Sequence, residues 1–478
     1  MRAVRSSFLM LIVALTIAGW AQPIHILSTG DMHGWLQGQT VDGQLLGGAA
    51  EMLAYWRQQE HYRPNADFLT ISCGDIATGP ALSTALKGDP VIDVMNRMGY
   101  TVTVLGNHEF DFGREHLLTW EKNAKFSFLC ANLVKADGAP NDIAVPYIID
   151  DIKGVKVGLI GVTTTEVTAI ADTGGLVAKP YAETLRKYVP EMRAKGAQTI
   201  IVVAHVPMVE LINLAKQVAD LNIPLMLGGH SHELGQTMVS GTHTWVINNG
   251  EWWKAYTRID LDYNPRTHNT ILLTAKQVWL QQDHPQADTA VQNDIKHWQQ
   301  QLDAQMGATL GYTVNGLTRP QGVANLFSAC YLGMDPTADV VVYNEGGFRQ
   351  EIAPGALNKG LITGVLPFNN VLYRVSVTGR QLLEYKMPEH CEFTGLRREG
   401  DRVVLAKTGQ PVNPETTYHL LITDYLYNKS ADLKAADPHP VTVAGDYRQP
   451  IIEWLTAHPT SKDKPLESII DVKAPLYP

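Results

Sequence analysis

The sequence predicts an α/β protein of two domains joined by a helix. In the first half of the chain, short apolar runs alternate with helical patterns, which is typical of a sheet covered by helices. After one amphipathic helix, a second mixed pattern of strands and helices begins near residue 309. The length of 478 residues also exceeds what one hydrophobic core usually serves.

The first domain begins with a series of buried strands. Helical patterns at 48–60 and 208–219 lie between some of them. Three more strand patterns, at 243–248, 254–262 and 270–278, predict a β-rich layer that closes the domain. The buried strands are predicted from apolar runs at 24–28, 68–72, 102–105, 155–160, 199–204 and 224–227.

A single helix is predicted to connect the domains. Its apolar side chains recur at helical spacing, and Gly307 can end it. They are Val291, Ile295, Trp298, Leu302 and Met306. The predicted divisions are 1–21, 22–285, 286–308 and 309–478; the last contains further strand patterns at 339–343, 371–377 and 418–422.

The N-terminus resembles a secretory signal peptide. Arg2 and Arg5 precede an apolar run at 8–19, and Gly19 and Ala21 are the small residues that a signal peptidase requires. We therefore expect cleavage after Ala21 and a mature chain in the periplasm or outside the cell, without a membrane anchor.

Composition excludes some partners. A net charge of −9 with interspersed signs argues against a nucleic-acid polymer, which favours a basic face. Small phosphorylated substrates stay possible, because bound metals supply local positive charge. The four cysteines are far apart, so we expect buried thiols more than a disulfide framework.

Five short motifs, nearly all at the end of a predicted strand, carry the chemistry. Carboxyl ends of strands are where α/β sheets collect catalytic groups. The motifs contribute carboxylates, imidazoles and one amide oxygen, which together suit two divalent cations. Zn, Mn, Fe or Co fits these ligands, and Mg fits at one position. The candidate ligands are Asp31, His33, Asp75, Asn107, His205, His230 and His232.

These motifs and their order along the chain resemble those of the calcineurin-like metallophosphoesterases over residues 24–278. The resemblance implies a two-sheet α/β sandwich in which a metal pair binds a hydroxide and the phosphate together. It assigns one metal to Asp31, His33 and His232, and the other to Asn107, His205 and His230, with Asp75 between them.

Two further residues resemble the family's catalytic machinery. His108 matches a histidine that stabilises charge on the phosphate or protonates the leaving oxygen. Asp111 matches the carboxylate that orients and charges this imidazole. An alternative role for Asp111 is to cap a helix at 114–119.

The second half resembles the C-terminal domain of 5′-nucleotidases at three segments: 344–349, 366–370 and 377–379. The resemblance implies that Arg349 contacts substrate and that Phe393 and Tyr425 sandwich a base. Alternatively, the two glycines before Phe348 form only a tight turn and Phe393 is a core residue. The family's Gly-Gly-Asp-Gly segment is replaced here by 429–432.

The predicted function is hydrolysis of a nucleoside 5′-monophosphate by a metal-bridging hydroxide. Alternatives on the same site are a 2′,3′-cyclic-nucleotide phosphodiesterase, a UDP-sugar hydrolase, a broad phosphomonoesterase or a hydrolase of thiosulfate esters. A non-catalytic binding protein would have lost a ligand or His108, and all are present. The resemblance also implies a hinge near 306–309. The sequence names neither the metals, the base nor the oligomeric state.

Overall fold

The computed structural model describes residues 23–41, 44–64, 67–282, 286–384 and 391–477. The predicted signal peptide at 1–21 lies outside the described residues. Among the helices that are described, none combines the length and apolarity needed to cross a membrane.

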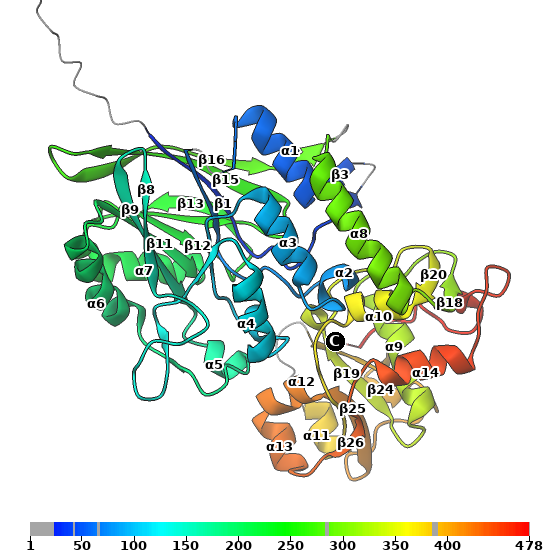
Figure 1. Cartoon of the computed structure of the whole chain (residues 1–478). Helices are drawn as coiled ribbons and strands as arrows, with labels where there is room; N and C mark the ends of the chain where they lie inside the picture. The colour runs from blue at the N-terminus through cyan, green and yellow to red at the C-terminus, as the bar shows by residue number, and fades with distance from the viewer. Residues whose placement is uncertain (1–22, 42–43, 65–66, 283–285, 385–390, 478) are drawn as a thin grey trace, which may run out of the picture.

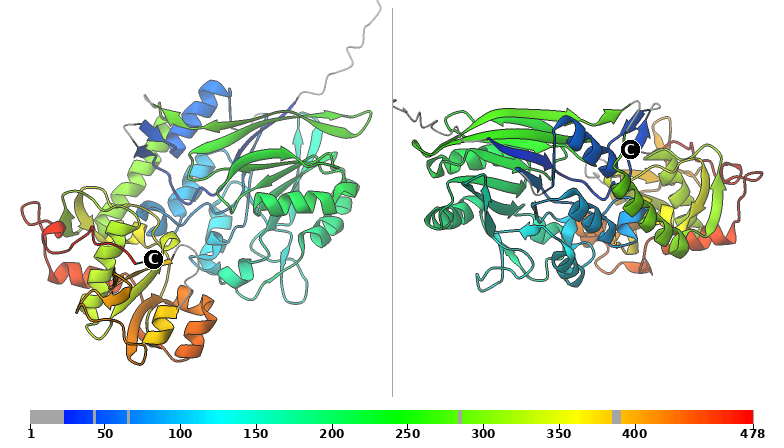
Figure 2. Two further views of the ribbon diagram at one scale, coloured as in Figure 1. Left: turned by 180° about the vertical axis from the view of Figure 1, so that it is seen from behind. Right: turned by 45° about the horizontal axis from the view of Figure 1, so that its top comes forward.

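Two six-stranded sheets face each other in the first domain (Figures 1 and 2). The first has the order β16 (Asn269–Trp279), β15 (Ala255–Asn264), β1 (Ile24–Thr29), β4 (Phe68–Ser72), β5 (Val102–Val104) and β6 (Ser127–Leu129). The second has the order β13 (Leu234–Met238), β14 (Trp245–Asn249), β12 (Leu225–Gly228), β11 (Thr199–His205), β9 (Val155–Thr163) and β8 (Tyr147–Ile152).

Helices cover the outer face of each sheet, which makes four layers. On the first sheet lie α1 (Ala49–Gln59), α3 (Asp89–Met98) and α4 (Arg114–Asn123), and on the second α6 (Tyr181–Ala194) and α7 (Met208–Gln217). Successive side chains of a strand point to opposite faces of its sheet, so each strand contributes to the core between the sheets and to the core under the helices. In β1, Ile26 packs between the sheets and Leu27 packs under the helices. In β11, Ile201 and Val202 divide in the same way.

The expected closing layer of three strands is not a separate layer. β14 pairs in parallel with β12 inside the second sheet, whereas β15 pairs antiparallel with β1 in the first sheet. The chain crosses from one sheet to the other after β14. The three strand patterns therefore extend both existing sheets, and β13 and β16 become the edges on one side of the sandwich.

The connecting helix forms as α8 (Thr289–Met306) and does more than connect. Val291, Ile295 and Leu302 are buried in the core beneath α1 and α3. Its C-terminal part reaches α2 (Ala81–Thr84) and α10 (Lys359–Val365), so it packs against both domains. Figure 1 shows α8 running from α1 down to the second domain.

The second domain has its own sheet and core. The sheet has the order β22 (Cys391–Thr394), β19 (Val340–Asn344), β25 (Thr417–Thr423), β21 (Leu372–Thr378) and β26 (Val441–Ala444). Around it lie α9 (Gln321–Met334), α12 (Asp424–Lys429), α13 (Ala431–Ala436) and α14 (Gln449–Ala457). The four cysteines are all buried and free, which confirms the expectation of buried thiols.

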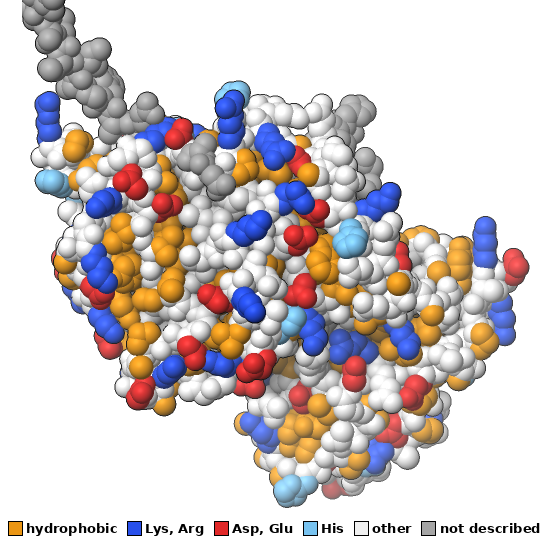
Figure 3. Space-filling view, in the orientation of Figure 1, with side chains coloured by type: hydrophobic (Ala, Val, Ile, Leu, Met, Phe, Trp, Pro, Cys, Tyr) orange, Lys and Arg blue, Asp and Glu red, His pale blue; other side chains and the backbone are white. Residues whose placement is uncertain are grey.

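The surface of both domains carries charges of both signs. On the face drawn in Figure 3, acidic and basic side chains are interspersed over the described residues. This distribution agrees with the interspersed charges of the sequence and its net charge of −9. A face of this kind differs from the continuous basic surface that a nucleic-acid polymer favours.

Candidate metal centre

Six of the seven candidate ligands contribute atoms to groups that could hold a metal ion, and all seven lie where five strands end. They follow β1, β4, β5 and β12 or, for His205, end β11. Five have a positive φ, namely Asp31 (46°), His33 (44°), Asp75 (50°), His230 (73°) and His232 (60°). Non-glycine residues seldom adopt this conformation, and strained backbone of this kind gathers at functional sites.

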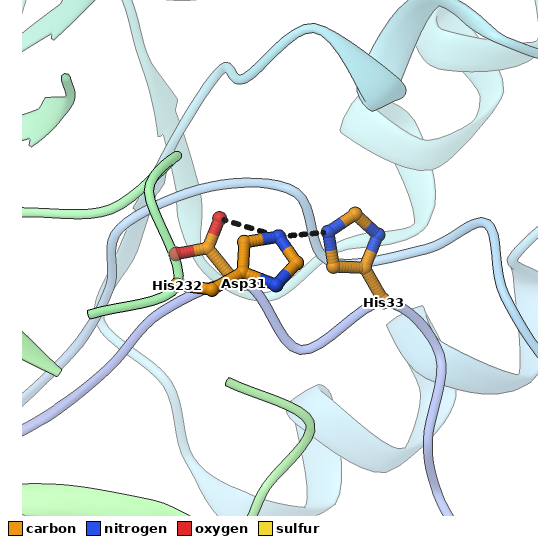
Figure 4. Close-up of side chains that lie close together, drawn as sticks. All are labelled: Asp31, His33 and His232. Atoms are coloured by element: carbon orange, nitrogen blue, oxygen red, sulfur yellow. Dashed lines mark hydrogen bonds and ion pairs between the residues drawn. The ribbon is translucent and has the colours of Figure 1, made fainter. Parts of the chain in front are cut away.

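One group of ligand atoms comes from Asp31, His33 and His232 (Figure 4). The Nε2 atoms of the two histidines are 3.1 Å apart. The Nε2 of His232 also lies 3.9 Å from Oδ1 of Asp31. Three ligand atoms of suitable chemistry therefore surround one point, although they belong to loops about 200 positions apart in the sequence.

A second group comes from Asp75, His205 and His230. The Nε2 of His205 lies 3.2 Å from Oδ2 of Asp75 and 3.1 Å from Nδ1 of His230. The same Asp75 oxygen is 3.7 Å from Nε2 of His33 in the first group. Asp75 therefore lies between the two groups, at the position that the resemblance gives to a bridging carboxylate.

Two buried oxygens at this place have no hydrogen-bond donor among the described residues: Oδ2 of Asp31 and Oδ1 of Asn107. Buried polar atoms without partners are rare in folded proteins and require an explanation. Burial opposes a charged His205, yet the Asp75 carboxylate raises the pKa of His205 to about 10. Oxygens that lack a donor within the described part of the protein fit divalent cations.

His108 lies beside the centre and is held by Asp111. Its Nδ1 is 2.7 Å from the Asp111 carboxylate, and its backbone N–H donates to Asp75. Burial opposes the charged imidazole, but Asp111 and Asp75 together hold the pKa of His108 above its usual value. Asp111 does not cap the following helix, because the N-cap of α4 is Gly113.

Glu109 is a positioning residue that was not predicted as part of the site. Its buried carboxylate accepts hydrogen bonds from the backbone N–H groups of Asp75, Ile76 and Gly106, at 3.2, 2.8 and 2.5 Å. Burial raises the pKa of Glu109 to about 7. This side chain ties the loop that carries Asp75 to the loop that carries Asn107.

The second domain brings Arg349 to the metal centre. Its Nη2 lies 3.4 Å from Nδ1 of His33. Burial lowers the pKa of the Arg349 guanidinium, and among the described residues no carboxylate forms an ion pair with it. A largely buried cation without an anionic partner costs free energy. An anionic ligand at this position would supply the missing partner.

Phe368 was not predicted as a site residue. Its ring stacks on the His108 imidazole with centroids 5.7 Å apart and an interplanar angle of 26°. The next residue, Asn369, donates a 3.2 Å hydrogen bond to the backbone oxygen of Asp111. The loop of the second domain thus covers the His108–Asp111 pair, and the only sequence signal was its membership in the 366–370 motif.

The expected pair of base-stacking rings needs a correction. Phe393 is only 3% exposed and packs in the core of the second domain against Tyr477. Its place on β22 opposite Val342 turns the ring inward, so neither of its faces is open to a ligand. Tyr425 is 40% exposed at the start of α12, and Lys429 donates to its hydroxyl.

Comparison with known families finds two matches along the chain. Residues 24–234 match the model for calcineurin-like phosphoesterases, and residues 305–387 match that for the 5′-nucleotidase C-terminal domain. The first match contains all seven candidate ligands with His108 and Asp111, and the second contains Arg349 and Phe368.

Curated relatives are distant. The 5′-nucleotidase of Vibrio cholerae is 26% identical over 416 residues, which cover 75% of this chain and 74% of the relative. Endonuclease YhcR of Bacillus subtilis is 24% identical over 455 residues, 84% of this chain. The chain spans only 37% of that relative's length.

A solved structure shares the fold. The 5′-nucleotidase precursor of Thermus thermophilus superposes with a TM-score of 0.74 at 22% identity, covering 92% of this chain and 97% of that one. The predicted fold class, an α/β sandwich with a second α+β domain, is thereby confirmed.

Proposed function

Because this chain is a metal-dependent phosphoester hydrolase of the 5′-nucleotidase family, we propose that it hydrolyses nucleoside 5′-monophosphates to nucleoside and phosphate. The observation that carries this proposal is the meeting of Arg349 with the metal centre. A partly buried cation from the second domain lies against His33, where the ligand groups converge. This arrangement suits a dianionic phosphate held from both domains.

We assign one cation to Asp31, His33 and His232, and a second to Asn107, His205 and His230, with Asp75 shared. A pair of such cations supplies Lewis-acid stabilisation of phosphate oxygens and lowers the pKa of a bound water. The residues of this chain orient the substrate. Arg349 pairs with a phosphate oxygen, and the ring of Phe368 shields His108 from solvent.

His108 acts on the leaving oxygen. Asp111 and Asp75 raise the pKa of His108 and so favour the protonated imidazole, which can stabilise the negative charge that develops there or donate its Nε2 proton. Asp111 fixes the orientation of the His108 ring, because its carboxylate accepts a hydrogen bond from Nδ1–H. The Nε2 atom is then free to face the substrate.

Burial of Phe393 favours a second candidate, a phosphomonoesterase with broad tolerance of the leaving group. Without that ring, Tyr425 is the one predicted stacking residue that is exposed. A single stacking face binds every base and discriminates little between them. We therefore infer activity toward simple phosphate esters as well as nucleotides.

The deciding experiment compares substrates with purified protein in Mn²⁺. AMP, p-nitrophenyl phosphate, 2′,3′-cyclic AMP and UDP-glucose are assayed with and without a chelator. We expect chelator-sensitive release of phosphate from AMP at the highest kcat/KM, with p-nitrophenyl phosphate next. Preference for the cyclic nucleotide or UDP-glucose would replace the proposed substrate, and chelator-resistant turnover would refute the metal assignment.

We also propose that the chain is exported and cleaved after Ala21. The basic and apolar segments of residues 1–21 support this. N-terminal sequencing of protein from its native host should give Gln22 as the first residue, and an intact Met1 would refute it.

A further inference from the structure

Three of the candidate ligand histidines direct Nε2 toward the centre and are held from behind at Nδ1. For two of them the acceptor is a backbone oxygen. His33 donates to the carbonyl of Thr78 at 3.0 Å, and His205 donates to the carbonyl of Cys73 at 2.8 Å. Hydrogen bonds of this kind fix the tautomer and the orientation of a ligand imidazole.

His232 differs because its acceptor is a carboxylate. Its Nδ1 lies 2.5 Å from an oxygen of Glu251, and the two side chains are 29% and 24% exposed. Within the described part of the chain, no other carboxylate bonds to the Nδ1 of these three imidazoles. A charged acceptor makes a stronger hydrogen bond than a carbonyl and fixes the orientation of the ring more firmly.

The turn that carries Glu251 is built to hold it there. Lys254 lies 3.8 Å from the Glu251 carboxylate and 4.1 Å from the centre of the Trp252 ring. Trp252 and Trp253 have φ angles of 56° and 59°, a strained conformation for two consecutive tryptophans. The backbone N–H of Trp252 also donates to the backbone oxygen of Asp31 at 2.9 Å.

This turn therefore touches two of the three residues in one ligand group. It contacts the backbone of Asp31 and the imidazole of His232, and among the described residues it makes no comparable contact with His205 or His230. Strain that persists in a fold is supported by its surroundings. Here Trp252 stacks on Trp35, and Trp253 is buried beside Tyr100 in the core of the first domain.

We propose that Glu251 is a positioning residue that sets the orientation of His232, and thereby the affinity of the Asp31–His33–His232 position for its cation. In the other position the Nδ1 of His205 donates to a backbone carbonyl, so we expect that position to be independent of Glu251. The inference rests on the metal-ligand assignment of the proposed function. The two cation positions therefore differ in what supports their ligand histidines. Only the position that contains His232 depends on a carboxylate side chain, which bonds to the Nδ1 of that histidine.

The test compares Glu251→Ala and Glu251→Gln with Glu233→Gln. Glu233 lies in the same loop as His232 and has the same charge, but its carboxylate accepts from Ser231 instead of an imidazole. Bound Mn²⁺ per chain is measured by elemental analysis during competition with a chelator. We expect wild type and Glu233→Gln to hold two ions tightly. Glu251→Ala should lose about 10–100-fold in affinity for one ion only, and Glu251→Gln should fall between.

Two readouts separate positioning from a general structural role. The melting temperature in excess chelator should be the same in wild type and Glu251→Ala, and saturating Mn²⁺ should restore most of kcat. Wild-type affinity for both ions in Glu251→Ala would overturn the inference and leave the proposed function standing. Equal weakening of both ions, or a lower melting temperature in chelator, would also overturn it. A wild-type chain that binds no divalent cation would refute the ligand assignment itself.

Discussion

At the scale of single residues, His108 is beside the ligands while its own Nδ1 is occupied by Asp111. Replacement by asparagine removes the charge and the transferable proton but no atom that we assign to a cation. His108→Asn should therefore keep its two metal ions, while kcat falls by ~10²–10⁴-fold, the usual contribution of acid–base catalysis. Elemental analysis and steady-state kinetics test this. Loss of both metals, or nearly normal turnover, would show that its role is misassigned.

Asp111→Asn tests how the imidazole is charged. The Asp111 carboxylate favours the protonated ring, so its neutralisation should lower the pKa of His108. Activity that requires protonated His108 is lost as pH rises through that pKa. The alkaline limb of the kcat profile should then move to lower pH than in wild type. An alkaline limb at the same pH as in wild type would show that deprotonation of His108 does not cause the loss of activity.

The sequence predicted the candidate ligands because each is marked by its immediate neighbours. A glycine or a small residue and a strand end stand beside most of them, so a short motif suffices. Glu251 has no such mark, and Phe368 is marked only by its place in the 366–370 motif. Glu251 contacts a histidine 19 positions away, and Phe368 contacts one 260 positions away. Contacts of this range depend on the assembled fold, and local patterns do not contain them.

At the scale of elements, helices and strands with a strong apolar period were predicted correctly from the sequence. Elements whose sequence pattern conflicts with their structure were not. The buried strands and α8 appear where apolar runs or a helical stripe predicted them. α6 continues through Pro190, a residue that normally interrupts a helix. β13 is a half-exposed edge strand with little apolar alternation. Nor does local sequence state which sheet a strand joins, which is why β14 to β16 were assigned to one layer.

The position of Phe393 within β22 leads to a prediction about stability. Its ring fills the core between the sheet and Tyr477, so Phe393→Ala should lower the free energy of unfolding by ~3–5 kcal/mol. KM for AMP and for p-nitrophenyl phosphate should be unchanged in the fraction that folds. Denaturant titration and kinetics on both substrates measure this.

Tyr425→Ala is the matched control in the same domain. Its ring is exposed, so stability should change by less than about 0.5 kcal/mol. KM should rise for AMP, by an amount corresponding to ~1–3 kcal/mol for one lost base stack, and stay constant for p-nitrophenyl phosphate. A selective rise in KM for AMP in Phe393→Ala would restore that residue to the nucleotide site.

At the scale of the whole molecule, activity should depend on how closely the second domain approaches the first. Arg349 reaches His33 and Phe368 reaches His108 across a contact between the domains in which α10 packs directly against α2. Gly364 makes this approach possible. A Cβ on Gly364 would lie 2.7 Å from the backbone nitrogen of Ala81, closer than folded proteins tolerate. The contact between the domains therefore requires glycine at that point of α10.

Gly364→Ala should separate the domains slightly without unfolding either one. Displacement of a substrate-positioning group by about 1 Å can cost ~10²-fold in rate, so kcat/KM for AMP should fall by that order while both metals stay bound. Gly360→Ala, one turn earlier in α10, is the control, because its Cβ would meet only ordinary contacts at 3.4 Å or more. Both alanines favour the helix equally. Equal kcat/KM in the two variants would mean that turnover does not require this approach of the domains.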